Sequence, residues 1–439
     1  MQKENYNSTI YALSSAEGKA GVSVIRISGN KSSEVINKLG GTTSYPRVAK
    51  ITKLVDPDNG EIVDKAIAIW FPGPNSFTGE DTVELFVHGG RAVIDKIFDI
   101  LARLNGLSFA EPGEFTKRSF MNGKLDLTSV EGLADLINAD TELQRKQALA
   151  QMEGSLFKLY DNWRTMLIKS LSYIEANIDF IEEDLPKNIL EKEMLFVSVT
   201  LDQINKHLSD GKKGERLRDG YRVVLAGAPN TGKSSLLNLL SNRDVAIVSS
   251  EPGTTRDIID VYLDINGCPV IISDTAGIRD SDSNIEQQGI DRAKSRIAES
   301  DLVLWLKDSS LKENIAYPYS SDNNIIEVWT KSDITVVERN QPFISVHNNT
   351  GIEDLIDLIG KNALNGCATE DSFITRARHR DSLIKISNSL TNALQIDLDN
   401  IEIIAEELRS ACNVLGKITG RVDVEDLLEV IFSDFCIGK

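Results

Sequence analysis

The spacing of apolar residues changes along the chain, and the changes separate regions of different secondary structure. In residues 1–118, short runs of alternating apolar and polar residues, such as 22–27, are divided by turn-forming residues. This pattern predicts a compact α+β domain. From about residue 120 to 210 the period becomes helical. The apolar residues that carry this period, in steps of four, three and four, are Leu167, Leu171, Ile174 and Ile178.

Residues 221–362 alternate apolar runs with helical segments, which is the pattern of a doubly wound α/β sheet. Helices return from about residue 375 to the end. The simplest organisation is a helical domain interrupted by an inserted α/β domain, and the alternative is three consecutive domains with a separate C-terminal bundle. The expected strands are 222–226, 270–273, 302–306, 325–329 and 343–346. The expected domains are 1–119 (α+β), 120–214 (helical, first part), 215–365 (inserted α/β) and 366–439 (helical, second part).

Composition adds limits to this organisation. The chain has 439 residues, of which 41% are hydrophobic and 26% charged, as in globular proteins of two or three domains. It has no apolar run of about 18 residues and no apolar leader, so we expect a cytoplasmic protein without a membrane span. The four cysteines have no metal-ligand spacing and are expected to be free thiols. They stand at positions 268, 367, 412 and 436.

The net charge of −18 disfavours non-specific binding to nucleic acid, because such binding comes mostly from neutralising phosphates. An RNA partner therefore requires a local basic patch. One candidate cluster lies at the start of the last helical region, although a solvated helix face explains it equally well. It consists of Arg376, Arg378, Arg380 and Lys385.

A phosphate-binding motif follows the first apolar run of the α/β region. The sequence Gly227-Ala-Pro-Asn-Thr-Gly232-Lys233-Ser234 matches G-x-x-x-x-G-K-S, between an apolar strand and a helix. Its backbone amides and the helix N-terminus suit phosphate. Lys233 is expected to reach the β- and γ-phosphates, and the Ser234 hydroxyl is expected to bind Mg²⁺.

Two further segments complete the expected triphosphate site. Asp274-Thr-Ala-Gly277 follows an apolar strand, so Asp274 is expected to hold Mg²⁺ through water and Gly277 to sense the γ-phosphate. Thr255 is the candidate switch threonine on Mg²⁺. Ile278 has no polar group to orient the attacking water, so another residue must do so. Glu286 is the best downstream carboxylate, and its alternative role is that of a solvated residue at a helix start.

Thr330-Lys331-Ser332-Asp333 follows the strand at 325–329 and predicts the base site. The Asp333 carboxylate can accept hydrogen bonds from two adjacent N–H groups of guanine, a pattern that adenine lacks. Thr330 stands where GTPases usually carry asparagine. A second loop expected at the base site, Ile344-Ser-Val-His347, ends the last expected strand. The nucleotide contacts expected from these segments are Asn230, Thr231, Gly232, Lys233, Ser234, Ser235, Gly253, Thr254, Thr255, Asp274, Thr275, Ala276, Gly277, Thr330, Lys331, Asp333, Ser345 and Val346.

Motifs outside the α/β region identify a family. They are Phe71-Pro-Gly-Pro-Asn-Ser-Phe-Thr-Gly-Glu-Asp-Thr-Val-Glu84, Val87-His-Gly-Gly90, Pro112-Gly-Glu-Phe-Thr-Lys-Arg118, Asn122-Gly-Lys-Leu-Asp-Leu127 and the terminal Phe435-Cys-Ile-Gly-Lys439. Together with the GTPase motifs, they make the whole chain resemble the tRNA-modifying GTPases of the MnmE (TrmE) type.

The resemblance implies a function for each region. The N-terminal domain would bind a tetrahydrofolate derivative (5,10-methylene- or 5-formyl-tetrahydrofolate) and form a homodimer. With the FAD-carrying partner MnmG, in a heterotetramer, the protein would modify carbon 5 of the tRNA wobble uridine. The residues that match the family's folate contacts are Arg26, Glu84, Lys124 and Lys439, and Cys436 matches a cysteine needed for modification.

The resemblance also implies GTP hydrolysis stimulated by potassium. Asn230 matches the K⁺ ligand, and 249–254, including Ser249, Glu251 and Thr254, matches the loop around the ion. The resemblance therefore adds Ser249, Ser250, Glu251 and Pro252 to the expected nucleotide contacts. Glu286 matches the residue that orients water.

One segment departs from the family, which usually reads Pro-Pro-Gly-Arg-Gly-Gly where this chain has Ala16-Glu-Gly-Lys-Ala-Gly21. Two other functions stay open: a ribosome-assembly GTPase switch without modification chemistry, and a folate-dependent one-carbon transferase that GTP only regulates. Folate binding by this chain would distinguish the family's function from the GTPase switch. Dependence of tRNA modification on the flavin partner would distinguish it from the one-carbon transferase.

Overall fold

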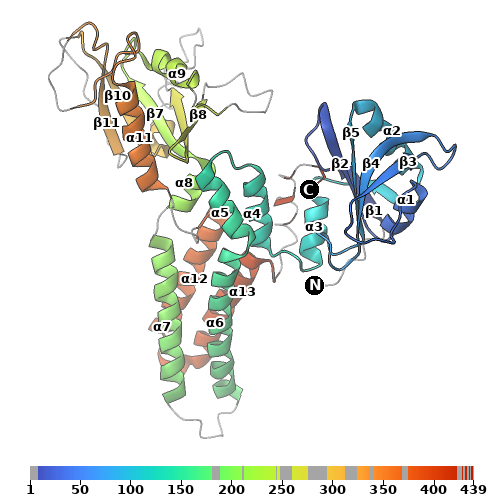
Figure 1. Ribbon diagram of the computed structural model, residues 1–439. Coiled ribbons are helices and arrows are strands. Elements are labelled where there is room, and N and C mark those ends of the chain that lie inside the picture. Colours follow the sequence, from blue (N-terminus) through green and yellow to red (C-terminus); the bar gives the residue numbers. More distant parts are fainter. Residues whose placement is uncertain are drawn as a thin grey trace, which may run out of the picture. The chain divides into compact units, whose positions relative to one another are not determined.

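The computed structural model forms two compact units, one of residues 1–134 with 419–439 and one of residues 135–418. Figure 1 shows the secondary structure of each. None of the described helices is both long and apolar enough to cross a bilayer. The residues that the structure describes are 8–179, 188–209, 212–243, 245–247, 260–274, 294–311, 324–335, 341–367, 374–422, 428, 431–432, 435 and 437–438.

The first unit is built on a six-stranded sheet in the order β3-β4-β5-β2-β1-β6. Strand β1 pairs parallel with β6, and the other neighbours pair antiparallel. The strands are β1 (Thr9–Leu13), β2 (Ala20–Ser28), β3 (Lys50–Val55), β4 (Ile62–Phe71), β5 (Thr82–Gly89) and β6 (Leu107–Phe109). The helices are α1 (Ser32–Lys38), α2 (Arg91–Arg103), α3 (Glu114–Met121) and α4 (Leu127–Ile137), of which residues 135–137 belong to the second unit.

Successive side chains of β2 point to opposite faces of this sheet, so the two faces contact different residues. Ile25 and Ile27 are fully buried in a core that includes residues of α1 and α2. Arg26, between them, points to the opposite face, where Phe115 of α3 packs. The sheet therefore has one apolar face and one face that can present charged groups.

The end of the chain completes the first unit. Phe432 and Phe435 pack in one apolar cluster with Phe120, Leu127 and Val130. Ile437 pairs with Pro112 through an isolated antiparallel bridge. Residues more than 300 positions apart in the sequence thus share this core, whereas the proposed domain boundaries at 119, 214 and 365 remain a prediction.

The second unit contains a helical bundle formed from two segments of the chain. Helices α6 and α7 precede the second sheet, α12 and α13 follow it, and the four share one apolar core (Figure 1). Trp163, Leu167, Ile204, Leu383 and Leu408 are all buried in it. The helical elements are α5 (Glu142–Met152), α6 (Ser155–Asp179), α7 (Asn188–Ser209), α8 (Lys213–Asp219), α12 (Ala377–Gln395), the 3₁₀ turn η1 (Leu398–Asn400) and α13 (Ile401–Thr419).

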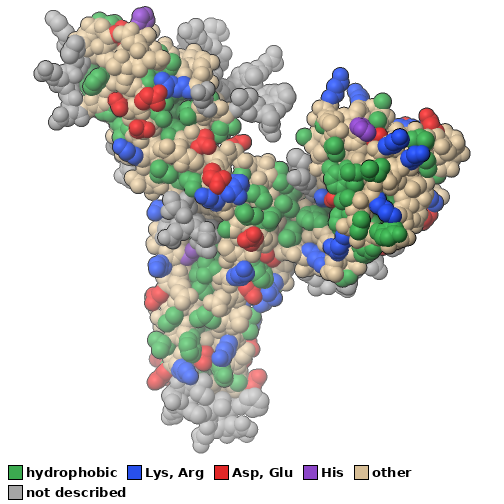
Figure 2. Space-filling model, in the orientation of Figure 1, with side chains coloured by type: hydrophobic (Ala, Val, Ile, Leu, Met, Phe, Trp, Pro, Cys, Tyr) green, Lys and Arg blue, Asp and Glu red, His purple; other side chains and the backbone are tan. Residues whose placement is uncertain are grey.

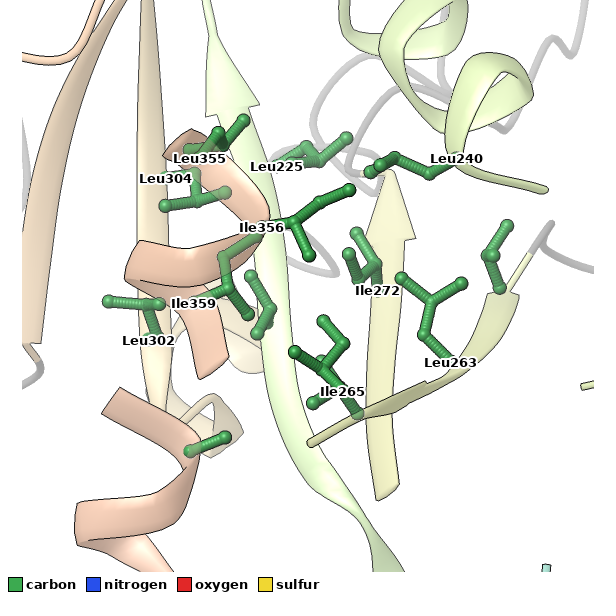
Figure 3. Packing of buried hydrophobic residues seen from close by; sticks show 14 of the residues in the cluster. Leu225, Leu240, Leu263, Ile265, Ile272, Leu302, Leu304, Leu355, Ile356 and Ile359 are labelled. Atoms are coloured by element: carbon green, nitrogen blue, oxygen red, sulfur yellow. The ribbon is translucent and has the colours of Figure 1, made fainter. Parts of the chain in front are cut away.

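The second unit also contains a five-stranded sheet in the order β11-β10-β7-β9-β8. Its strands are parallel except for β8, which is antiparallel to β9. Ile356 and Ile359 of α11 (Ile352–Gly366) pack over Leu225, Ile272 and Leu304 of the sheet (Figure 3). The strands are β7 (Tyr221–Gly227), β8 (Asp260–Ile265), β9 (Cys268–Asp274), β10 (Leu302–Asp308) and β11 (Asn324–Thr330), and α9 (Lys233–Ser241) follows β7.

Four of the five strands expected from the sequence are confirmed, and the α/β and α+β classes with them. The expected strand at 343–346 is wrong, because the chain turns back there and forms only isolated bridges, from Phe343 to Trp329 and from Ser345 to Thr350. Strand β8 was not expected. It lies at the sheet edge, and its buried residues alternate with exposed or half-buried ones, so it lacks a continuous apolar run.

Candidate functional site

The phosphate-binding motif forms a tight loop between β7 and α9. Gly227 ends β7 with a φ of +150°, and a Cβ there would lie 2.5 Å from the Leu306 carbonyl oxygen, so a larger residue does not fit. Gly232, with a φ of +92°, is the N-cap of α9, and Asn230 also has a positive φ of +65°. Glycine tolerates these left-handed conformations without strain. The loop therefore leads directly into the N-terminus of α9, which favours anions.

The Lys233 ammonium group lies over this loop. Its Nζ donates hydrogen bonds to the carbonyl oxygens of Gly227, at 3.0 Å, and Ala228, at 2.9 Å. The side chain is buried, and burial lowers its pKa. A buried cation beside a helix N-terminus is suited to bind phosphate oxygens.

Two oxygen ligands suitable for Mg²⁺ meet next to the loop. The Ser234 hydroxyl, from the first turn of α9, donates a hydrogen bond of 2.8 Å to Oδ2 of Asp274, the last residue of β9. Carboxylate and hydroxyl oxygens are the donors that Mg²⁺ prefers, so the pair fits this ion. The parallel order of β7 and β9 brings the two residues together from 40 positions apart in the sequence.

The Asp333 carboxylate is held by the second loop expected at the base site. The Ser345 hydroxyl donates a hydrogen bond of 2.6 Å to Asp333 Oδ1. This bond and the backbone N–H of Asp333 lower the pKa of the carboxyl group. Asp333 therefore has the ionised, oriented carboxylate that two adjacent N–H groups require. Val346, next in the chain, is half-buried against the core of the sheet.

Thr330 and Lys331 connect the base loop to its surroundings. The Thr330 hydroxyl donates to the Thr231 carbonyl oxygen at 2.8 Å. Lys331, with a φ of +60°, pairs with Asp308 at 2.5 Å. Burial of Asp308 opposes its ionisation, but hydrogen bonds from Lys331 and Ser310 outweigh this effect and lower its pKa. Asp308 was not among the expected residues, although an aspartate at the end of an apolar strand is a signal that could have identified it.

The first unit brings two expected folate contacts together. Arg26 on β2 and Glu84 on β5 are direct cross-strand partners. The Arg26 Nε and Nη2 lie 3.0 and 2.9 Å from Glu84 Oε1, and both side chains are 19% exposed. The rings of Phe77 and Phe115 lie 5.2 and 5.6 Å from the guanidinium carbon of Arg26, and these flanking aromatic residues were not expected from the sequence.

Lys124 lies near the same loop. A Cβ added at Gly79, two residues beyond Phe77, would be 3.4 Å from Lys124 Cε, so the end of this side chain lies beside the loop that carries Phe77. Lys124 is exposed. Three of the four expected folate contacts therefore belong to one region of the first unit.

The remaining expected residues lie outside the part of the chain that the structure describes. They are Ser249, Ser250, Glu251, Pro252, Gly253, Thr254, Thr255, Thr275, Ala276, Gly277, Glu286, Cys436 and Lys439. Ser235, in the first turn of α9, is described and exposed.

The basic cluster at the start of α12 is engaged within the protein. Arg376 pairs with Asp135 at 2.9 Å, Arg380 pairs with Glu215 at 3.0 Å, and Arg378 donates to the Ile418 carbonyl oxygen. Figure 2 shows basic and acidic side chains interspersed over the visible face of the helices. These three arginines therefore make contacts within the second unit, whereas Lys385 is exposed, and an RNA-binding patch here remains a prediction.

A parallel sheet with a phosphate loop, a Ser–Asp pair for Mg²⁺ and an oriented Asp333 defines a P-loop GTP-binding protein. Residues 127–436 match the family described as MnmE helical domain, and residues 9–124 match the one described as GTP-binding protein TrmE N-terminus. The chain belongs to the MnmE (TrmE) family of tRNA modification GTPases.

Relatives match over nearly their whole lengths. The tRNA modification GTPase MnmE of Parvibaculum lavamentivorans is 47% identical over 440 residues, which cover 98% of this chain and 100% of that protein. The protein of the same name from Beijerinckia indica is 43% identical over 438 residues, 98% of this chain and 96% of its own. A Danio rerio protein named 5-taurinomethyluridine-[tRNA] synthase subunit GTPB3, mitochondrial, is 41% identical, and the match covers 98% of this chain and 93% of that one.

Proposed function

We propose that this chain is a potassium-stimulated GTPase that modifies carbon 5 of the tRNA wobble uridine. It would act with a flavoprotein of the MnmG type and install a carboxymethylaminomethyl or aminomethyl group, using methylene-tetrahydrofolate. The observation that carries the proposal is the presence, in one chain, of a phosphate loop with the Ser234–Asp274 pair and of the Arg26–Glu84 pair. The names of these relatives refer to tRNA modification and support the same function.

In the GTPase part, Lys233 would neutralise the β- and γ-phosphates. Ser234 and Thr255 would bind Mg²⁺ directly, and Asp274 would hold it through water. Asp333, oriented by Ser345, would select guanine. Asn230, exposed in the loop with its φ of +65°, would contribute to a K⁺ site. That cation would supply the positive charge that an arginine finger supplies elsewhere, and Glu286 would orient water.

In the folate part, Arg26 and Glu84 would recognise the pterin. Both Arg26 nitrogens engage Oε1 of Glu84, so Oε2 of the carboxylate can accept hydrogen bonds from the amino-pyrimidinone edge. Lys124 and the terminal Lys439 would bind the glutamate tail. The folate would supply the one-carbon unit, and the chain's own residues would hold it in place.

The proposal also covers the assembly. Residues 1–119 would form a homodimer, and the helical domain, divided by the GTPase domain at 215–365, would transmit the nucleotide state to the partner. GTP hydrolysis would drive a conformational change and would not perform the modification chemistry itself. Cys436 would serve the modification reaction. We place the protein in the cytoplasm, where tRNA and GTP are available.

Nucleoside analysis of tRNA from cells that lack this protein tests the proposal. The modified wobble uridine should disappear, return with the wild-type gene, and stay absent with Lys233→Ala or Glu84→Ala. Loss of ribosome assembly with unchanged tRNA nucleosides would instead establish the GTPase switch without modification chemistry. Restoration by Lys233→Ala but not by Glu84→Ala would favour a one-carbon transferase that GTP only regulates.

A further inference from the structure

Thr330 lies between the two loops that form the nucleotide site. It is the last residue of β11 and is 2% exposed. Its hydroxyl is 2.8 Å from the carbonyl oxygen of Thr231, in the phosphate loop, and 3.2 Å from that of Lys307, on β10. A side chain of the base loop therefore binds the backbone of the phosphate loop across 99 positions of sequence.

The chemistry of this contact limits what else Thr330 can do. A hydroxyl has one hydrogen to donate, and the shorter distance assigns it to the Thr231 carbonyl oxygen. The β-branched side chain has few rotamers, so the hydroxyl is held in this direction at little entropic cost. The hydrogen is thus used inside the protein and is not free for the base.

The accepting carbonyl lies where the phosphate loop turns into its helix. Thr231 is 2% exposed, and its own hydroxyl donates to Ala228 at 2.9 Å. The next residue is Gly232, the left-handed N-cap of α9, and Lys233 follows. Fixing the Thr231 carbonyl therefore fixes the turn that presents the amides at the start of α9 and the Lys233 side chain.

On the other side, Thr330 begins the segment that ends at Asp333. The Ser309 N–H donates to the Thr330 carbonyl oxygen at 3.1 Å, and the Ser309 hydroxyl donates to that of Lys331 at 2.9 Å. Ser345 holds Asp333 at 2.6 Å. These contacts make residues 330–333 one supported segment, so a displacement at Thr330 changes the position of the carboxylate.

We propose that Thr330 is a positioning residue that couples base recognition at Asp333 to phosphate binding at the 227–234 loop, an inference that rests on the GTP-binding part of the proposed function. Its hydroxyl makes the link between the loops at a position where GTPases usually carry asparagine. Because it acts through the protein, its loss weakens nucleotide binding, and saturating nucleotide restores the position of the loop and of Lys233.

The test compares wild type with three variants of the full chain. Thr330→Val keeps the shape and removes the hydroxyl, Thr330→Ala removes the hydroxyl and the methyl group, and Thr330→Ser keeps the hydroxyl. Thr330→Val and Thr330→Ala should each raise the Kd for GDP, measured by calorimetry, and the KM for GTP about tenfold. The reason is that one buried hydrogen bond is lost and its acceptor is left unsatisfied. At saturating GTP, kcat should stay within about twofold, and Ser should stay within about threefold of wild type in every parameter.

Wild-type affinity in Thr330→Val and Thr330→Ala would overturn the inference, even if the melting temperature falls, since the hydroxyl would then serve only stability. A Ser variant as weak as the Val variant would also overturn it, because packing of the methyl group would then be responsible. Failure of the wild-type chain to bind GDP would refute the GTPase assignment and this inference together. Unchanged binding by the variants refutes the inference alone.

Discussion

At the scale of single residues, the Asp333 carboxylate depends on a partner from another loop. The Ser345 hydrogen bond lowers the pKa of Asp333. Because the pKa of Asp333 is lower in the folded than in the unfolded protein, the ionised carboxylate stabilises the fold. This contribution is present above the unfolded pKa of about 3.9 and is lost as the pH falls through the folded pKa. Ser345→Ala should move the pKa up towards that ordinary value, as measured by NMR titration of the carboxyl carbons. Asp308, whose partners are Lys331 and Ser310, should not shift and is the internal control.

Asn230 provides a second test at this scale. If it contributes to a K⁺ site, GTP hydrolysis should be faster in KCl than in NaCl at equal ionic strength, and Asn230→Ala should abolish the difference. Asn242→Ala is the matched control, since this exposed asparagine follows α9 and bonds to the Asn238 carbonyl oxygen. Equal wild-type rates in the two salts would refute the potassium assignment and leave the phosphate loop unaffected.

The Arg26–Glu84 pair provides a third test at the scale of single residues. Arg26→Ala or Glu84→Ala should weaken 5-formyl-tetrahydrofolate binding at least about tenfold, because each removes a charge-assisted hydrogen bond. GTP affinity should not change. Arg91→Ala, whose side chain is 94% exposed, should keep wild-type folate affinity. Calorimetric titrations that find wild-type affinity in both site variants would contradict the folate assignment.

At the scale of elements, the Val87-His-Gly-Gly90 motif is explained by the pairing of β2 with β5. Gly89 lies where the register shifts between Ala20 and Ser23, and a Cβ there would meet the Ala20 carbonyl oxygen at 2.6 Å and Ser23 Oγ at 2.7 Å. At Gly90, the N-cap of α2, nothing lies within 4 Å of an added Cβ. The first glycine is therefore required by close approach of two strands, and the second is not.

This difference predicts opposite results for two neighbouring substitutions. Gly89→Ala should destabilise the first unit by about 1–3 kcal/mol, because the strands must move apart to admit the methyl group. Gly90→Ala should have little effect, since its φ of −86° suits alanine. Urea denaturation, with hydrogen exchange read at β2 and β5, measures both. Equal stability of the two variants would mean that the sheet absorbs the methyl group.

At the scale of the whole molecule, the first unit needs the end of the chain. Phe432 is 4% exposed and packs against Phe120 and Leu127. Phe432→Ala should lower the free energy of unfolding of the first unit by about 3–5 kcal/mol, and its melting temperature should fall. Ile62→Ala, an apolar truncation at a side chain that is 55% exposed, is the control. GTP affinity should not change in either variant, because Asp333 and the phosphate loop belong to the other unit.

The sequence by itself determined the local elements and the residue types of the site. Strands β7, β9 and β10 were predictable because they lie inside the sheet, are mostly buried and therefore read as continuous apolar runs. The edge strand β11 is buried only in its second half, but it was predictable because four of its residues, 325–326 and 328–329, are apolar. The phosphate loop was predictable because its chemistry lies within eight consecutive residues, Gly227 to Ser234. The folate contacts could be named only through the family's motifs.

Only the tertiary structure decided which of these residues meet. Arg26 pairs with Glu84 across 58 positions, Thr330 reaches Thr231 across 99, and Ser14 donates to the Gly438 carbonyl oxygen across 424. Hydrophobic period reports burial of a segment and not the identity of the segment that covers it. These contacts are set by the strand order, by the strand register and by the return of the chain's end to the first unit. Each sheet and helix must bury its apolar face against another element, and this packing brings polar side chains from distant parts of the sequence together.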